Sequence, residues 1–311
     1  MRLGPAVLPL GLALTVLAGA EDASAQQASA RVRGLPGAMR VDPRPCPSVP
    51  TADIRRRIVE IAVREWGFFG FRVAPAPEGG DEEARDETGG ERRRRSRLPP
   101  AEAERVAPSI AGYWAVTPEG SWIVARQNDR WNGPDGITAR WNAPWSAAFI
   151  SWVMCEAGLG GPAQFRRAIA HHSYIDQALR ARDGRAPEAA FLAHDIGEAT
   201  IEPGDLLCSS RRPAYRTIAE RRRQMGIGAR SHCDIVVKVD EARGEVFAIG
   251  GNVRGIVSLK VLPVAPPLFA HLKLRAASGT YNGLDILSGG VECVQLSSSS
   301  SSPPCRWRPS W

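Results

Sequence analysis

The sequence predicts an α+β fold, with helices in its first two thirds and strands in its last third. Apolar residues recur at helical spacing in residues 51–66 and again in residues 144–158. Residues 232–239 and 245–249 are rich in apolar and β-branched side chains and are separated by a turn, which is typical of a β-hairpin. A hydrophobic share of 43% over 311 residues is ample for a packed core.

The first 25 residues have the pattern of a secretory signal peptide. Arg2 supplies the positive charge, residues 6–18 are mostly apolar, and Ala23-Ser24-Ala25 is a small-x-small cleavage site. The apolar stretch is shorter than the ~20 residues that span a bilayer, which disfavours a transmembrane anchor. No later stretch of the sequence is long and apolar enough either, so we expect a periplasmic or secreted protein without a membrane span.

Six cysteines fit such export, because disulfides form in oxidising compartments. Cys293 and Cys305 flank a serine- and proline-rich stretch, and a disulfide between them is the pairing that we expect first. Cys208 and Cys233 lie in expected strands and can bridge neighbours. Alternatively, Cys155 and Cys208 are simply small buried hydrophobic residues. The sequence leaves the full connectivity open.

Composition divides the rest of the chain into one domain and its flanking segments. Residues 74–105 combine an acidic cluster, an arginine run and paired prolines without an apolar face, which predicts a disordered insertion. The serine run near the C-terminus predicts a loose tail. The expected organisation is a signal peptide (1–25), an extended segment (26–50), a packing helix (51–73), the insertion (74–105), the main α+β domain (106–275) and the tail (276–311).

The net charge and the aromatic residues indicate which kind of molecule the protein binds. A net charge of +7 suits an anionic envelope polymer such as peptidoglycan, whereas the lack of a basic helix with interleaved aromatic residues disfavours nucleic acid. Trp131, Trp141 and Trp145 belong to a tryptophan cluster that is either core or the wall of a substrate groove, because a tryptophan face stacks on sugars and peptide planes. The sequence does not define the oligomeric state.

Three polar residues lie where the expected elements can bring them together. Ser146 starts the helix of residues 144–158, His232 starts a strand, and Asn252 ends the next strand. A serine at a helix N-terminus gains from the dipole and from free N–H groups, a histidine can take its proton, and an Asn or Asp can orient the ring. Asp234 lies on the same strand face as His232 and is the alternative to Asn252.

Residues 145–153 resemble the nucleophile helix of the CHAP amidases, a branch of the NlpC-type papain-like superfamily, in which a Trp-Cys-Ala-Ala-Phe pattern begins the helix. Residues 203–207, 231–237 and 250–253 resemble, in the same order, that family's Pro-Gly-Asp turn, its histidine strand and the strand end that carries its third polar residue. The resemblance covers roughly residues 109–264. The whole chain also resembles a secreted bacterial group known only as a domain of unknown function, which is itself similar to the CHAP amidases.

The resemblance implies a papain-like fold, with a helix packed on a small antiparallel sheet, and cleavage of amide bonds in peptidoglycan by a cysteine, a histidine and an orienting residue. This chain has Ser146 where those amidases have cysteine. A serine hydroxyl must lose its proton during attack, to a base already within reach. Two functions stay open: a hydrolase that uses Ser146, His232 and Asn252, or a catalytically inactive module that keeps the groove for wall binding or envelope assembly.

A metal site is a third and weaker interpretation. His171 and His172 can bind a metal together with His194 or Asp195, but the sequence has neither an HExxH motif nor a cysteine pair at zinc spacing. We therefore expect no metal and no cofactor.

The mature protein is expected to begin at Gln26, because the cleavage site ends at Ala25. N-terminal sequencing of protein isolated from the cell envelope checks this expectation. Protein that retains Met1 in that fraction would contradict it.

Overall fold

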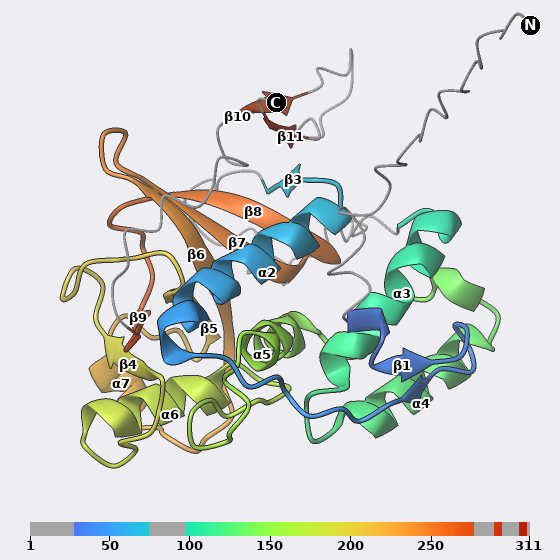
Figure 1. The fold of residues 1–311 in the computed structure, drawn as a ribbon, viewed down its shortest axis with the longest axis horizontal. Helices are drawn as coiled ribbons and strands as arrows, with labels where there is room; N and C mark the ends of the chain where they lie inside the picture. Colours follow the sequence, from blue (N-terminus) through green and yellow to red (C-terminus); the bar gives the residue numbers. More distant parts are fainter. Residues whose placement is uncertain (1–27, 75–97, 277–288, 294–304, 310–311) are drawn as a thin grey trace, which may run out of the picture.

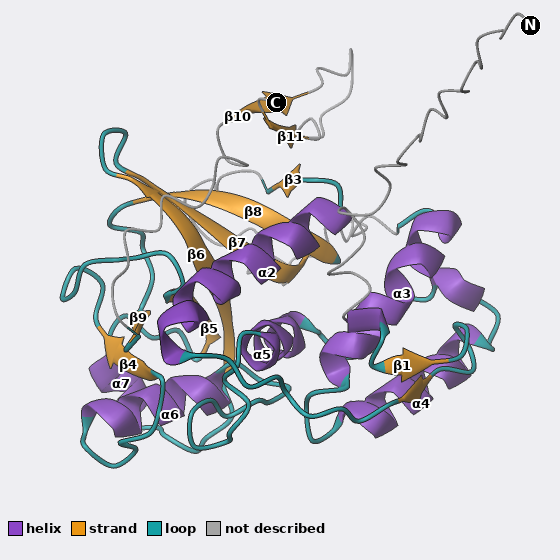
Figure 2. Cartoon of the chain, viewed as in Figure 1, coloured by secondary structure: helices purple, strands orange, loops and turns teal. Residues whose placement is uncertain are grey.

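A computed structural model describes residues 28–74, 98–276, 289–293 and 305–309 and has a mixed α+β fold, as the sequence predicts (Figure 1, Figure 2). The helices are η1 (Thr51–Asp53), α2 (Ile54–Phe68), α3 (Pro100–Trp114), α4 (Gly120–Trp131), η2 (Gly136–Thr138), α5 (Ser146–Glu156), α6 (His172–Arg182) and α7 (Ile218–Arg222). The strands are β1 (Val32–Arg33), β2 (Arg40–Val41), β3 (Arg72–Val73), β4 (Phe191–His194), β5 (Leu206–Arg212), β6 (Arg230–Asp240), β7 (Glu245–Val253), β8 (Ile256–Pro263), β9 (Ala270–Leu274), β10 (Gly289–Cys293) and β11 (Cys305–Pro309). The expected signal peptide lies outside the described residues.

Nine of the described strands form one sheet in the order β10-β11-β3-β8-β7-β6-β5-β9-β4. The pairs are antiparallel except for β3 with β8. The sheet is therefore not the small sheet that the sequence led us to expect. Strands β9 and β4 extend it at one edge, and β3 with the two tail strands extends it at the other.

The centre of the sheet is the predicted hairpin of β6 and β7. Ile235 faces Ile249 in its register, and Asp240 faces Glu245 next to a turn that contains Gly244 at φ 66°. Because successive side chains of a strand point to opposite faces of the sheet, the hairpin contributes to two hydrophobic clusters. The smaller cluster contains Leu207, Val236, Val246, Ala248 and Leu262.

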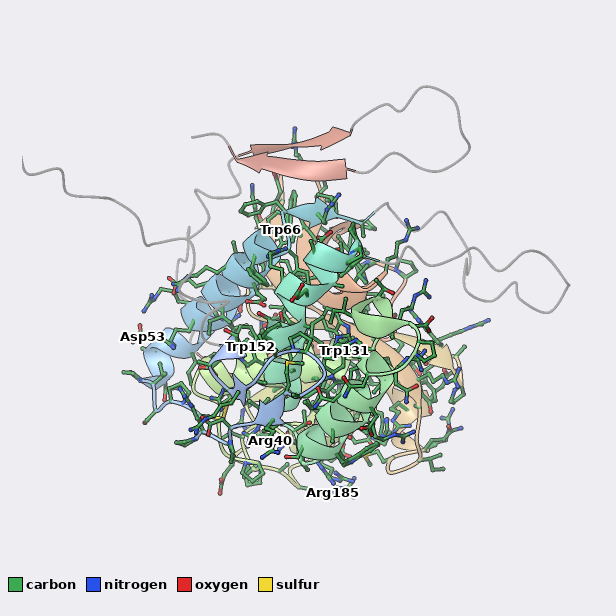
Figure 3. All side chains as sticks on the ribbon, turned by 90° about the vertical axis from the view of Figure 1, so that its right-hand side faces the viewer. Arg40, Asp53, Trp66, Trp131, Trp152 and Arg185 are labelled. Carbon is green, nitrogen blue, oxygen red and sulfur yellow. A yellow bond between two sulfur atoms is a disulfide. The ribbon has the colours of Figure 1, made fainter. Side chains whose placement is uncertain are left out.

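Helix α5 packs on the hairpin next to α2, which also contacts the sheet. All of its residues after Ser146 are buried, and it contacts α2, α3, β6 and β7. Two of the tryptophans labelled in Figure 3, Trp66 of α2 and Trp152 of α5, are fully buried. Since α5 is apolar on every side, its position is fixed by burial rather than by one amphipathic face.

Two disulfides connect described segments that are distant in sequence. Cys46 bonds Cys155 at the end of α5, and Cys208 bonds Cys233 across β5 and β6. The bond between Cys208 and Cys233 confirms the prediction that these two cysteines bridge neighbouring strands. The interpretation of Cys155 and Cys208 as simple buried hydrophobic residues is wrong. The expected Cys293–Cys305 bond involves side chains outside the described set, although these two residues face each other in the register of β10 and β11.

The two disulfides are compatible with a protein that is exported to an oxidising compartment. Within the described ranges, the helices are all too short or too polar to cross a membrane.

The structure differs from two of the segments that composition predicted. The charged insertion was expected to reach residue 105, but α3 begins at Pro100, where proline is well placed in a first helical turn. Residues 75–97 lie outside the described set. The tail was expected to be loose, yet β10 and β11 pair at the sheet edge, because short strand segments there can complete a backbone ladder.

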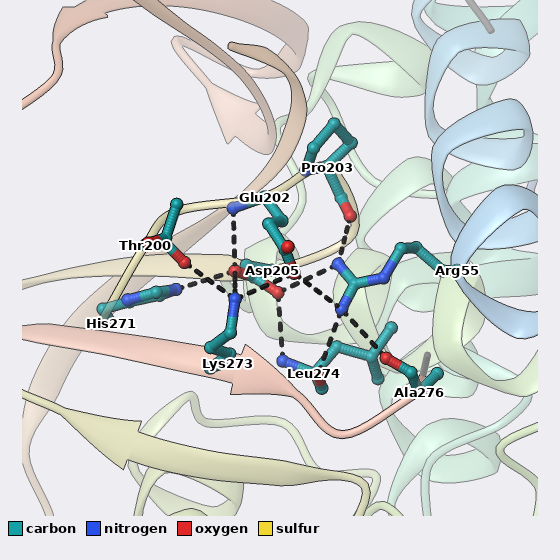
Figure 4. A network of polar contacts seen from close by, with 9 residues as sticks. All are labelled: Arg55, Thr200, Glu202, Pro203, Asp205, His271, Lys273, Leu274 and Ala276. Atoms are coloured by element: carbon teal, nitrogen blue, oxygen red, sulfur yellow. Dashed lines mark hydrogen bonds and ion pairs between the residues drawn. The ribbon is translucent and has the colours of Figure 1, made fainter. Parts of the chain in front are cut away.

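The Pro203-Gly204-Asp205 turn joins α2 to the sheet through a buried polar network (Figure 4). Arg55 of α2 donates to Asp205 Oδ1 at 3.2 Å and to the Leu274 carbonyl at 3.0 Å. His271 Nε2 donates to Asp205 Oδ2 at 2.8 Å, and both residues are fully buried. Buried charges need such partners, so the role of this turn in the described residues is structural: it fixes α2 against the sheet.

Glu65 is an acidic residue on the buried face of α2. The Tyr113 hydroxyl donates to its Oε1 atom, and Oε2 has no partner among the described residues. Burial raises the pKa of Glu65 to about 8, since the charged form loses its hydration. The folded protein therefore holds this carboxyl neutral at pH 7.

Glu65→Gln is expected to reduce the pH dependence of the free energy of unfolding. Because the folded-state pKa is raised above 4.5, the Glu65 contribution is fully present below pH 4.5 and is lost as the pH rises towards 8. The variant cannot ionise, so its free energy of unfolding should rise relative to that of the native protein across that window, by about 5 kcal/mol at most. Urea unfolding at pH 5, 7 and 8.5 measures the free energy of unfolding of both proteins. The same pH dependence in the two proteins would contradict the prediction.

Candidate functional site

Ser146 is the first residue of α5, an eleven-residue helix. It is half-buried, whereas Trp145 before it and Ala147 after it are buried. Among the described residues no side chain caps this helix start, so its first backbone N–H groups can act as donors. A hydroxyl at this position lies at the positive end of the helix dipole, where a developing negative charge is stabilised.

Two consecutive glycines at the end of β7 allow α5 to come this close to the sheet. A Cβ atom on Gly251 would lie 2.5 Å from the Cβ atom of Phe149, in the first turn of α5. A Cβ atom on Gly250 would lie 2.0 Å from Asp234 Oδ1 and 2.9 Å from His232 Nε2. Glycine is therefore required at both positions on steric grounds, and the Gly-Gly-Asn motif marks the point where helix and hairpin meet.

The hydroxyl of Ser146 is hydrogen-bonded to a histidine that precedes α6. Its Oγ atom lies 2.7 Å from His171 Nε2. The other ring nitrogen, Nδ1, accepts the backbone N–H of Cys233 at 3.2 Å and also contacts the Tyr174 hydroxyl. A backbone N–H can only donate, so Nδ1 is the acceptor and Nε2 carries the hydrogen of the neutral ring. His171 therefore donates to Ser146.

His171 is 4% exposed, and this burial lowers its pKa well below the ordinary range. The neighbouring His232 acts in the same direction, because two histidines this close repel each other when both are charged. The ring centroids of His171 and His232 are 5.2 Å apart. His171 is therefore neutral at pH 7.

A second polar chain begins at His232 on β6. His232 Nε2 donates to Asp234 Oδ1 at 2.8 Å, and Lys260 Nζ of β8 donates to Asp234 Oδ2 at 2.8 Å. Burial opposes ionisation of Asp234, but Lys260 and His232 together hold its pKa below the usual range. Burial lowers the pKa of His232, and the charge of Asp234 opposes that shift. With Nε2–H engaged by the carboxylate, the lone pair of the neutral ring is on Nδ1.

The structure thus brings three of the residues that sequence analysis selected into one cluster, namely Ser146, His232 and Asp234. The carboxylate of Asp234, rather than the amide of Asn252, bonds His232. Asn252 is the last residue but one of β7 and has φ 57°, and no hydrogen bond joins it to His232 among the described residues. No direct hydrogen bond between Ser146 and His232 is present in the described part of the chain either.

Sequence analysis missed His171 as a partner of Ser146 and considered it only as a metal ligand. Among the described residues, no group of three or more His, Cys, Asp or Glu side chains could hold a metal ion. The segment before α6 returns to α5, where Ala168 bonds Ser151 and His171 bonds Ser146, and no spacing in the sequence predicts these contacts.

The three tryptophans proposed as a groove wall occupy different environments. Trp145 is only 1% exposed and packs against Phe69 and Tyr113, so it belongs to the core and does not line an open groove. Trp131 is also buried, and the half-buried Trp141 packs against it edge to face with ring centroids 5.1 Å apart.

Comparison with known proteins places the chain in one family. A family model described as an uncharacterized protein conserved in bacteria (DUF2272) matches residues 104–272, which is more than half of the chain. The chain therefore belongs to this family, and the matched region contains Ser146, His171, His232 and Asp234. No curated protein and no solved structure matches the chain.

His171→Gln is expected to weaken the loss of stability in mild acid. Because burial lowers the folded-state pKa of His171, its contribution is fully present above pH 6.5 and is lost as the pH falls below that value. The variant cannot take up this proton, so it should lose less free energy of unfolding than the native protein as the pH falls. Urea unfolding at pH 7.5 and pH 5 tests this, and an equal acid loss in both proteins would refute it.

Proposed function

We propose that this member of the DUF2272 family is a serine hydrolase that cleaves amide bonds of an envelope polymer such as peptidoglycan, on a papain-like, CHAP-like scaffold. The observation that carries the proposal is the position of Ser146. Its hydroxyl lies at an uncapped helix start, accepts a hydrogen bond from His171, and belongs to a cluster with a second buried histidine that Asp234 orients. Buried ionisable groups are costly, and such clusters concentrate at functional sites.

In the proposed reaction, Ser146 Oγ attacks the carbonyl carbon of the amide while its proton passes to Nδ1 of His232. His232 is the candidate base because Asp234 holds its Nε2–H and leaves the Nδ1 lone pair available. Because no direct hydrogen bond joins Ser146 to His232 among the described residues, the proton passes through one bridging water. The carbon–nitrogen bond then breaks, the imidazolium protonates the leaving amine, and water hydrolyses the resulting ester by the same route.

The free N–H groups at the start of α5 can stabilise the oxyanion of the tetrahedral intermediate. Backbone donors of this kind are already oriented, so they need no reorganisation as the charge develops. The order of elements supports the same chemistry, since the nucleophile helix α5 precedes the histidine strand β6 and packs on it, as the resemblance to CHAP amidases implies.

An envelope polymer is proposed as the substrate for two reasons. The first residues of the sequence have the pattern of a signal peptide, and the two disulfides fit an exported protein. The chain carries a net charge of +7, and Arg211 and Lys260 act electrostatically on the histidines of the cluster. A cationic site favours a polymer that carries carboxylates.

A binding module without catalysis is the second candidate function. The observation that favours it is the hydrogen on His171 Nε2, because the histidine in contact with Ser146 cannot accept the serine proton in this tautomer. In that case the same surface would bind wall fragments without cleaving them.

Ser146→Ala is expected to abolish the release of new amino groups from purified peptidoglycan and to leave wall binding intact. His232→Ala should do nearly the same, because nucleophile and base act as one unit. Ser151→Ala is the matched control, since it removes a hydroxyl from the same helix that bonds the Ala168 carbonyl instead. Cleavage by Ser146→Ala at the native rate would refute the proposal.

Ser146→Cys separates the two candidate functions. A thiol at this helix start is expected to ionise readily, because the dipole and the His171 N–H stabilise the thiolate. Native cleavage supports the hydrolase. An inert native protein that binds wall fragments, together with an active cysteine variant, would favour the binding module.

A further inference from the structure

We propose that His171 acts as a fixed hydrogen-bond donor to Ser146 Oγ, stabilising the negative charge that develops there, and that the proton of the serine goes to His232. This inference rests on the proposed hydrolase function and assigns different roles to the two histidines of the cluster.

First, His171 Nδ1 is already occupied by hydrogen-bond donors. The Cys233 N–H that it accepts belongs to the backbone of β6, and the disulfide between Cys233 and Cys208 ties that strand to β5. The Tyr174 hydroxyl also contacts Nδ1, and burial raises the pKa of Tyr174 well above its usual value, so this hydroxyl keeps its proton. Two donors at Nδ1 leave the ring hydrogen on Nε2.

Second, the ring of His171 is held in this orientation. His171 is buried, and a half-turn of the ring would put Cδ2 in the place of Nδ1 and Cε1 in the place of Nε2, so that the Cys233 N–H and Ser146 Oγ would both lose their hydrogen bonds to the ring. Ser146 Oγ therefore accepts from His171 in every low-energy orientation, and the serine hydrogen remains free to be donated to another group.

Third, the charges around the rings of His171 and His232 differ. The titratable and charged groups that act on His171 are Tyr174, Arg211, His232, Asp234 and Lys260. The rings of His171 and His232 are too close for both to be cationic at low cost, with centroids 5.2 Å apart. Only His232 has a carboxylate bonded to it, through Asp234. A neutral His171 thus allows the imidazolium to form at His232, next to its counter-charge.

The consequence for the reaction is a donor whose hydrogen bond strengthens as Ser146 Oγ loses its proton. The donor is neutral and already in place, so it favours the charged state of the oxygen over its ground state. His171 touches the reacting atom and therefore counts as a catalytic residue, but it neither gains nor loses a proton during the cycle.

The tautomer is measured directly by long-range ¹H–¹⁵N NMR on native protein labelled with ¹⁵N-histidine, with the His171 signals assigned by their loss in His171→Gln. The expected result is a neutral ring with a protonated Nε2 and an unprotonated Nδ1 between pH 6 and pH 8. An Nδ1–H tautomer, or an imidazolium in that range, would overturn the inference whether or not the protein cleaves peptidoglycan.

The role in catalysis is measured with two variants of similar size. His171→Gln keeps an N–H donor but cannot act as a base, whereas His171→Met has no donor. We expect the methionine variant to lose kcat by about 100-fold or more, as is typical when one donor to a developing negative charge is removed, and the glutamine variant to lose much less, because it still donates to Ser146 Oγ. The pH profile of the glutamine variant should match the native profile, because His232 is the group that titrates.

These measurements separate the inference from the function on which it rests. If the native protein cleaves peptidoglycan and His171→Gln is as inactive as His232→Ala, the donor role is wrong and the hydrolase stands. If the native protein cleaves nothing, the hydrolase fails, while the tautomer still decides whether His171 donates to Ser146. Unfolding curves of both variants identify any loss of activity that comes from misfolding.

Discussion

The candidate site depends on the close approach between the first turn of α5 and the end of β7. Gly250 and Gly251 permit that approach, because a side chain at either position would collide with the His232–Asp234 pair or with Phe149. The contact places a serine at a free helix start beside the beginning of β6. His171, the residue before α6, then bonds the Ser146 hydroxyl.

Buried polar groups in this fold serve structure as well as the site. Arg55, Asp205 and His271 fix the Pro-Gly-Asp turn against α2, and their hydrogen bonds offset the cost of removing charge from water. The cluster around Ser146 uses the same physics to set proton positions, since the Cys233 N–H holds one ring and Asp234 holds the other. Burial of both rings keeps them neutral and available for different roles.

Much of the fold and part of the site could be predicted from the sequence. The β6–β7 hairpin and the helix that starts at Ser146 follow from local patterns, and Asp234 was identified because alternate residues of a strand share a face. His171 could not be found in this way, because its bond to Ser146 depends on how the segment before α6 returns to α5. The nine-stranded sheet was missed because β3, β10 and β11 are short strands whose pairing is defined by distant partners.

The central claim is that Ser146 is an activated nucleophile in the folded protein. Its most direct test is reaction with a fluorophosphonate, which forms a covalent bond with an activated serine hydroxyl, followed by intact mass measurement and peptide mapping. A single adduct on Ser146, formed when folded protein is treated and absent when the protein is denatured before treatment, is the predicted result. An unmodified Ser146 in folded protein, or equal labelling of exposed serines, would contradict the claim.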